Sequence, residues 1–111
     1  MAEADRPTIS THVLDLETGM PAVGVHVRLW RVGDDGRSSP AGDAVTDDDG
    51  RARDLLSGRP LEAGGYRLEF LLGGEGFFGG LSVGIRIEDP GRSYHVPLLR
   101  SPFGLTTYRG S

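Results

Sequence analysis

The sequence lacks four residue types, and each absence excludes a class of chemistry. Its 111 residues include no cysteine, lysine, asparagine or glutamine, so all twelve basic residues are arginines. Without cysteine there is no disulfide or thiol nucleophile, and without lysine there is no Schiff-base or P-loop chemistry. A chain of this length buries enough surface to fold as one unit without a metal or disulfides. We expect a single domain over residues 8–111, preceded by a flexible tip over residues 1–7.

Strong charge and long apolar runs are also missing. The net charge of −4 disfavours electrostatic binding to nucleic acid or to an anionic membrane. No run approaches the roughly 20 apolar residues of a membrane span, and Met1 to Pro7 is polar and acidic, unlike a signal peptide. These features predict a cytoplasmic protein whose partners are small molecules, with no nucleic acid or membrane among them.

Glycine and proline are abundant, with 18 and 7 residues, which predicts many turns and little helix. Apolar residues alternate with polar ones over Val23–Arg31, Tyr66–Leu72 and Leu81–Glu88, the period of a half-buried strand. On the first of these, Val23 is predicted to share the buried face with Val25, Val27 and Leu29. Shorter β-prone segments are Thr8–Leu14, Ala44–Thr46, Arg51–Leu55, Tyr94–Leu99 and Thr106–Arg109.

The pattern predicts an all-β protein, an antiparallel β-sandwich of seven or eight strands. The short loops predict that every strand pair is antiparallel, with 44–46 and 51–55 forming a hairpin across Asp47–Gly50. Pro97 has no backbone N–H, so its strand is expected at an edge or a bulge.

Three short motifs have simple structural interpretations. Residues 80–84 spell G-x-S-x-G, but Ser82 lies within an alternating strand and not at a strand-to-helix turn. Residues 74–79 spell G-x-G-x-x-G, but a strand follows where a phosphate-binding helix is required. The acidic run 47–50 lacks the calcium ligands expected at its flanking positions, so we interpret it as a solvated turn.

The three histidines are His12, His26 and His95, and no two have the close spacing of a metal site. His26 lies on the polar face of its strand, which indicates a surface role. His12 and His95 lie in largely apolar segments, where an imidazole must be hydrogen-bonded internally or belong to a site. From these residues alone, the structural role is favoured. The final residues, 108–111, are expected to dock against the domain.

Two terminal regions carry a family resemblance. The first is Ser-Thr-His-Val-Leu-Asp at 10–15, continued by Thr-Gly-Met-Pro-Ala at 18–22. The second runs from Tyr-His-Val-Pro-Leu-Leu at 94–99 through Ser-Pro-Phe-Gly at 101–104 to Thr-Tyr-Arg-Gly-Ser at 107–111. Together with the Asp-Gly-Arg turn at 49–51, these residues resemble the transthyretin-like 5-hydroxyisourate hydrolases of purine degradation. The Tyr-Arg-Gly-Ser ending separates those enzymes from hormone-carrying transthyretins.

The resemblance implies the transthyretin β-sandwich, assembled as a homotetramer with active sites at the dimer–dimer interface. It implies hydrolysis of 5-hydroxyisourate to 2-oxo-4-hydroxy-4-carboxy-5-ureidoimidazoline, with no metal or organic cofactor. The residues that match the family's catalytic positions are His12, Arg51, His95 and Ser111, and those that match its substrate-binding tail are Tyr108, Arg109 and Gly110. Which histidine acts as the base stays open at this point.

The sequence also departs from the family pattern. The family's short helix after the strand at 66–72 is expected to be lost, because only a glycine-rich stretch, 73–80, remains. Ser93, Arg100 and Leu105 replace a usual His, Leu and Tyr. Two alternatives to the hydrolase are a non-catalytic transthyretin-like protein that binds a small ligand and a generic β-sandwich interaction module.

Overall fold

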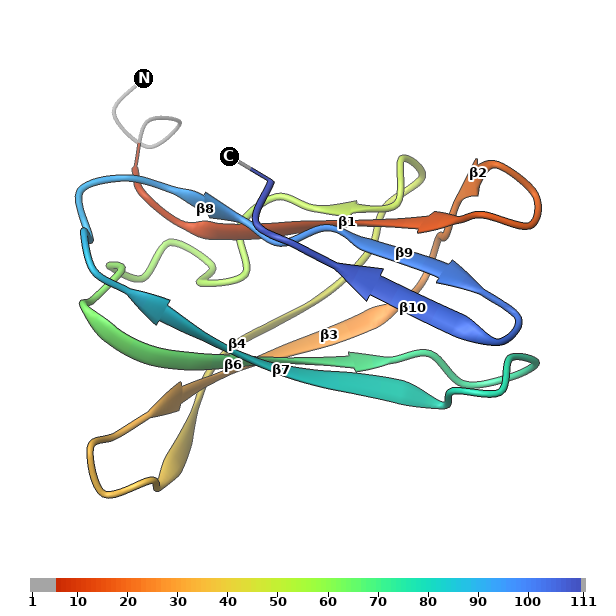
Figure 1. Ribbon diagram of the computed structural model, residues 1–111. Helices are drawn as coiled ribbons and strands as arrows, with labels where there is room; N and C mark the ends of the chain where they lie inside the picture. The colour runs from red at the N-terminus through yellow and green to blue at the C-terminus, as the bar shows by residue number, and fades with distance from the viewer. Residues whose placement is uncertain (1–5, 111) are drawn as a thin grey trace.

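The structure, a computed structural model, describes residues 6–110. Ser111 and most of the predicted tip, residues 1–5, lie outside the described residues. The described chain forms ten β-strands and no helix, which confirms the all-β class. The strands form two layers packed face to face (Figure 1). No helix within residues 6–110 is long and apolar enough to cross a membrane.

The ten strands divide into two sheets. The first sheet contains β1 (Ile9–Asp15), β2 (Met20–Pro21), β5 (Arg51–Ala52), β8 (Tyr94–His95), β9 (Leu98–Ser101) and β10 (Gly104–Thr107). The second contains β3 (His26–Val32), β4 (Ser38–Val45), β6 (Gly64–Leu71) and β7 (Gly80–Ile87), in the order β4-β3-β6-β7. The count exceeds the predicted seven or eight because three strands are only two residues long.

The first sheet is built around β1. One edge of β1 pairs antiparallel with β2 and β5, and the other edge pairs with β8 and β9 in parallel. The prediction of an entirely antiparallel sandwich is therefore wrong for this edge. Hairpin rules apply to neighbouring strands joined by short loops, whereas β1 and β8 come from opposite ends of the described chain. Pro97 lies in the break between β8, which pairs with β1 alone, and β9, which lies between β1 and β10. Its carbonyl accepts a hydrogen bond from Thr107 Oγ1 at 2.8 Å.

The predicted hairpin across residues 47–50 is also wrong. β4 pairs with β3 in the second sheet and β5 pairs with β1 in the first, so the turn carries the chain from one layer to the other. The strand ahead of this turn is much longer than predicted, because it begins at Ser38. The last strand lies at 104–107 and not at 106–109.

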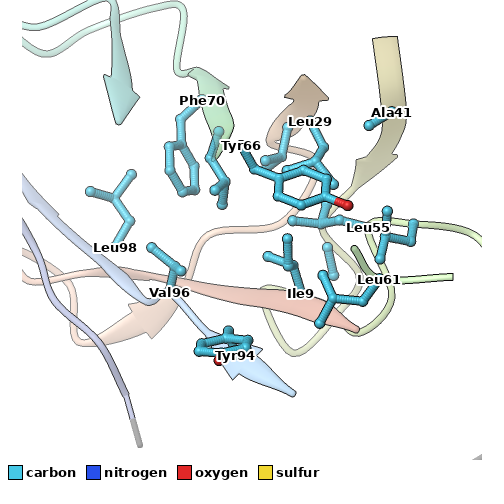
Figure 2. Close-up of a cluster of buried hydrophobic side chains, with 14 of the residues drawn as sticks. Ile9, Leu29, Ala41, Leu55, Leu61, Tyr66, Phe70, Tyr94, Val96 and Leu98 are labelled. Carbon is cyan, nitrogen blue, oxygen red and sulfur yellow. The ribbon is translucent and has the colours of Figure 1, made fainter. Parts of the chain in front are cut away.

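The core lies between the sheets (Figure 2). Along β1, Ile9, Thr11 and Val13 point inward and are fully buried, so the residues between them face outward. The second sheet contributes fully buried apolar side chains from β3 and β6, Val27, Leu29, Leu68 and Phe70. Val23 does not extend this face as predicted, because it precedes β3 at a turn where Gly24 has a φ of +81°, and it is 58 % exposed.

The stretch at 73–80 forms an irregular loop, as predicted from its glycines. Gly73 and Gly74 have φ values of +59° and +65°, which favour glycine and do not occur in a right-handed helix. The amide of Leu72 donates to the carbonyl of Gly79 at 3.0 Å and closes the loop. Ser82 lies inside β7, so the G-x-S-x-G pattern is not a nucleophile elbow.

Candidate functional site

Three strands bring His12, Arg51 and His95 to the outer face of the first sheet. His12 alternates with the buried residues of β1 and therefore faces outward. In the strand pairing, His12 lies opposite Arg51 of β5, and Ser10 lies opposite His95 of β8. One face of β1 therefore packs in the core, and the opposite face forms part of a polar surface site.

These side chains line one open pocket together with the chain after β10. Its lining residues are His12, Leu14, Arg51, His95, Pro97, Leu99, Tyr108, Arg109 and Gly110. The structure therefore brings together six of the seven predicted site residues. The seventh, Ser111, lies outside the described residues. Leu14, Pro97 and Leu99 were not predicted to line the site, because their apolar character alone indicates only packing.

Arg51 is presented by the turn that crosses between the sheets. The carboxylate of Asp47 accepts hydrogen bonds from the amides of Asp49 and Arg51 at 2.9 and 3.0 Å. The Asp47 amide donates to the Arg51 carbonyl at 2.9 Å, and Gly50, with a φ of +75°, closes the turn. The hydrogen bond from the Arg51 backbone is the main cause that lowers the pKa of Asp47 below its usual value. Sequence reasoning identified the turn as solvated but missed that Asp47 holds Arg51 in place.

His95 is half-buried and surrounded by cationic or ionisable groups. Burial is the largest cause that lowers its pKa, followed by the positive charge of Arg51 and by His12, while a hydrogen bond with the Ser10 backbone partly opposes them. The imidazole is therefore kept in its neutral form near pH 7. Its Nδ1 lies 2.9 Å from Ser10 Oγ. Ser10 was noted only as part of the terminal motif, because its contact with His95 depends on the parallel pairing of β1 and β8.

The segment after β10 lies against His95. Figure 1 shows it turning back over the outer side of the first sheet, and the Gly110 amide donates to the His95 carbonyl at 2.8 Å. A Cβ at Gly110 would lie 2.9 Å from His95 Cδ2 and 3.0 Å from Pro97 Cγ, so the close approach requires glycine. The Arg109 guanidinium lies over the Tyr94 ring, 5.0 Å from its centroid, which anchors the segment by a cation–π contact.

The third histidine lies elsewhere. His26 is on the outer face of the second sheet, as its surface prediction required, and its Nε2 lies 2.9 Å from Asp43 Oδ2. Within residues 6–110, no group of three or more His, Cys, Asp or Glu side chains is arranged to hold a metal ion. The described pocket instead offers a neutral imidazole and a guanidinium, which suit proton transfer and stabilisation of developing negative charge.

Comparison with known proteins places this arrangement in a family. Residues 9–110 match the family described as HIUase/Transthyretin. The chain belongs to that family. A 5-hydroxyisourate hydrolase of Caulobacter vibrioides is 41 % identical, over 93 % of this chain and 97 % of the relative. A 5-hydroxyisourate hydrolase of Halalkalibacterium halodurans has the same identity over the same shares of the two chains.

Solved structures show that this fold is shared by a 5-hydroxyisourate hydrolase and by a transthyretin. The 5-hydroxyisourate hydrolase of Klebsiella pneumoniae superposes with a TM-score of 0.76 and 35 % identity, over 95 % of this chain and 94 % of the other. Sea bream transthyretin in complex with thyroxine superposes with a TM-score of 0.81 and 28 % identity, over 91 % and 92 %. Because backbone likeness is as high for the transthyretin as for the hydrolase, function must be argued from the site.

Proposed function

We propose that this protein is a 5-hydroxyisourate hydrolase that acts in urate degradation through His12, Arg51 and His95. The observation that carries the proposal is the meeting of these three side chains, from three strands, in one pocket. The names of the relatives with 41 % identity support the substrate and the reaction. The terminal Tyr108, Arg109, Gly110 and Ser111 complete the site as substrate-binding and catalytic residues.

In the proposed reaction, His95 is the general base. Its neutral imidazole takes one proton from a water molecule, and the water oxygen bonds to a carbonyl carbon of the substrate ring. Negative charge builds on the carbonyl oxygen, where the Arg51 guanidinium stabilises it. The bond between that carbon and the ring nitrogen then breaks, and the nitrogen receives the proton from the imidazolium. One water is consumed, the ring opens to a carboxylic acid that releases its remaining proton to solvent, and His12 orients the substrate.

Arg51 suits this role because its charge is not used within the described chain. No carboxylate of residues 6–110 lies within 4.0 Å of its guanidinium, whereas Arg28 and Arg31 of β3 in the second sheet lie 4.0 Å from Glu69 and 3.9 Å from Glu62. A half-buried cation without an ion pair attracts an anionic ligand or a developing oxyanion.

We also propose that four copies assemble, with the pocket at an interface. β7 and β10 are both edge strands, and the groove between them is lined in part by Val83, Ile85, Tyr94 and Tyr108. Unpaired strand edges with apolar side chains favour pairing with another copy. Light scattering should give about four times the 11.9 kDa chain mass, and a monomer with full activity contradicts the proposal.

The decisive experiment compares hydrolysis with ligand binding alone. 5-Hydroxyisourate is generated from urate by urate oxidase, and its decay is followed with and without the protein. We expect accelerated decay with the native chain and with His26→Ala, and a spontaneous rate with His95→Ala. A folded native protein that binds the substrate or a hormone-like ligand but leaves the decay rate unchanged supports the alternative of a non-catalytic protein that binds a small ligand.

A further inference from the structure

Ser10 contacts the imidazole of His95 but is not one of the predicted site residues. Ser10 lies on the outer face of β1, next to His95 in the parallel pairing with β8. Its hydroxyl oxygen lies 2.9 Å from His95 Nδ1, which is hydrogen-bonding distance. No other described side chain is hydrogen-bonded to the ring, so within residues 6–110 the Nε2 nitrogen is left without a protein partner.

The backbone on both sides of this contact is fixed. The Val96 amide donates to the Ser10 carbonyl at 2.9 Å, and the Gly110 amide donates to the His95 carbonyl at 2.8 Å. The Thr11 hydroxyl, buried beneath the same pair of strands, donates to the Val96 carbonyl at 2.6 Å. Since β1 and β8 cannot slide past each other, Ser10 Oγ is held at the same edge of the imidazole.

A serine hydroxyl can donate or accept, so the ring's surroundings decide the direction of this bond. If the hydroxyl donates to Nδ1, the proton of the neutral ring lies on Nε2, and the ring cannot act as a base toward the pocket. If Nδ1–H donates to Oγ, Nε2 carries a lone pair. The charged and titratable residues that line the pockets beside the ring are Arg51, Arg53, Arg109, His12 and Tyr108. Cations favour a lone pair over an N–H on the side that faces them.

We propose that Ser10 is a positioning residue whose hydroxyl oxygen accepts a hydrogen bond from the Nδ1–H of His95 and thereby leaves Nε2 unprotonated toward the pocket. The neutral ring agrees with this direction, because a neutral imidazole has one N–H to donate to Oγ and one lone pair left on its other nitrogen. Ser10 touches no reacting atom. It acts by selecting which nitrogen of His95 is the base, and this role rests on the hydrolase function proposed above.

The tautomer of His95 tests the proposal without reference to catalysis. A free neutral imidazole favours the Nε2–H form, so the native protein and Ser10→Ala should differ. Proton–nitrogen correlation spectra of the imidazoles, recorded above pH 7, should show Nδ1–H for His95 in the native protein. They should show a shift toward Nε2–H in Ser10→Ala and a return to Nδ1–H in Ser10→Thr, which keeps the hydroxyl. A native protein with the Nε2–H form, or no change in Ser10→Ala, overturns the proposal.

Activity provides the second readout. Ser10→Ala should lower kcat about tenfold with little change in KM, since substrate contacts remain while fewer molecules have the competent tautomer. Ser10→Thr should recover most of the loss, and Ser39→Ala, the same change at an exposed position of β4, should have no effect. If the native protein does not hydrolyse 5-hydroxyisourate but shows the Nδ1–H form lost in Ser10→Ala, the proposed function fails and the role of Ser10 in setting the tautomer stands.

Discussion

The outer faces of the two sheets both carry histidine and arginine, but in opposite electrostatic settings. On the second sheet, His26 lies 2.9 Å from a carboxylate of Asp43, and Arg28 lies 4.0 Å from Glu69. On the first sheet, His95 is hydrogen-bonded to a neutral hydroxyl, and no described carboxylate pairs with Arg51. The same residue types are thus neutralised on one face and left available on the other.

This difference indicates how a functional site can be recognised on the surface of a β-sandwich. Exposed ion pairs contribute little to stability, about 0 to 1 kcal/mol each, and occupy the polar atoms that a ligand needs. A half-buried guanidinium beside a neutral imidazole, with no carboxylate of the described chain paired to it, is typical of a functional site.

Removing the imidazole of the first sheet should have the largest effect. We expect His95→Ala to lower turnover of 5-hydroxyisourate about 10²-fold or more, because a general base typically contributes that much. His26→Ala should leave turnover unchanged, since Asp43 already occupies its Nε2. Initial rates of both variants, with folding checked by circular dichroism, test the pair. Similar rates in the two variants would remove the distinction between the faces.

The arginines form the second matched pair. Arg51→Ala should lower kcat/KM about 10²-fold, because it removes the charge that stabilises the oxyanion. Arg28→Ala removes an exposed arginine of β3 and should have no effect on the rate. The thermal unfolding midpoints of both variants should stay close to that of the native protein. A large loss with Arg28→Ala, or none with Arg51→Ala, would contradict the assignment of charge stabilisation to Arg51.

The close approach of the tail should be sensitive to a single methyl group. Gly110→Ala places a carbon 2.9 Å from His95 Cδ2, so the tail or the ring must move, and we expect turnover to fall about tenfold. Gly79→Ala is the control, because its Cβ meets no atom within 4 Å. Steady-state kinetics should show the effect at residue 110 only. Full activity in Gly110→Ala would mean that the tail does not help to position His95.

Asp47 should affect the site through Arg51. Asp47→Ala removes both hydrogen bonds from the turn, and we expect kcat/KM to fall severalfold, while Asp48→Ala, its exposed neighbour, should change nothing. Because the pKa of the Asp47 carboxyl is lowered by folding, its stabilising contribution is present above the ordinary value of 3.8 and is lost as the pH falls below it. The free energy of unfolding of Asp47→Ala should therefore depend less on pH than that of the native protein as the pH falls below 3.8. An unchanged acid transition would argue against this role of Asp47.

The rate should change little with pH near neutrality. A neutral His95 is required as the base, and its pKa is held below the ordinary value of 6.5 by burial and by Arg51. We therefore expect the rate to stay at more than about half of its plateau at pH 6.5 and to fall at lower pH. Arg51→Ala should move the residual acid limb to higher pH, because the positive charge is gone. An acid limb centred above 6.5 would contradict a neutral base with a lowered pKa.

Much of the fold could be predicted from the sequence because it depends on local rules. The alternation at 66–72 and 81–88 predicts strands that the structure contains as β6 and β7, and the glycines at 73 and 74 exclude a helix between them. Alternation also places His12 on the opposite face from Val13. The candidate residues themselves came from a terminal motif and its family resemblance, and not from spacing, which gave no reason to bring His12 and His95 together.

The tertiary structure decided which of these residues meet. The parallel pairing of β1 with β8 joins opposite ends of the described chain and places Ser10 beside His95, a contact that no local pattern contains. The crossing at 47–50 sends β5 to the first sheet, opposite His12, where short-loop rules predicted a hairpin with β4. Periodicity fixes the face that a strand buries because it depends on successive residues alone. The choice of partner strand depends on how two whole sheets bury their apolar faces together, and that choice assembled the site.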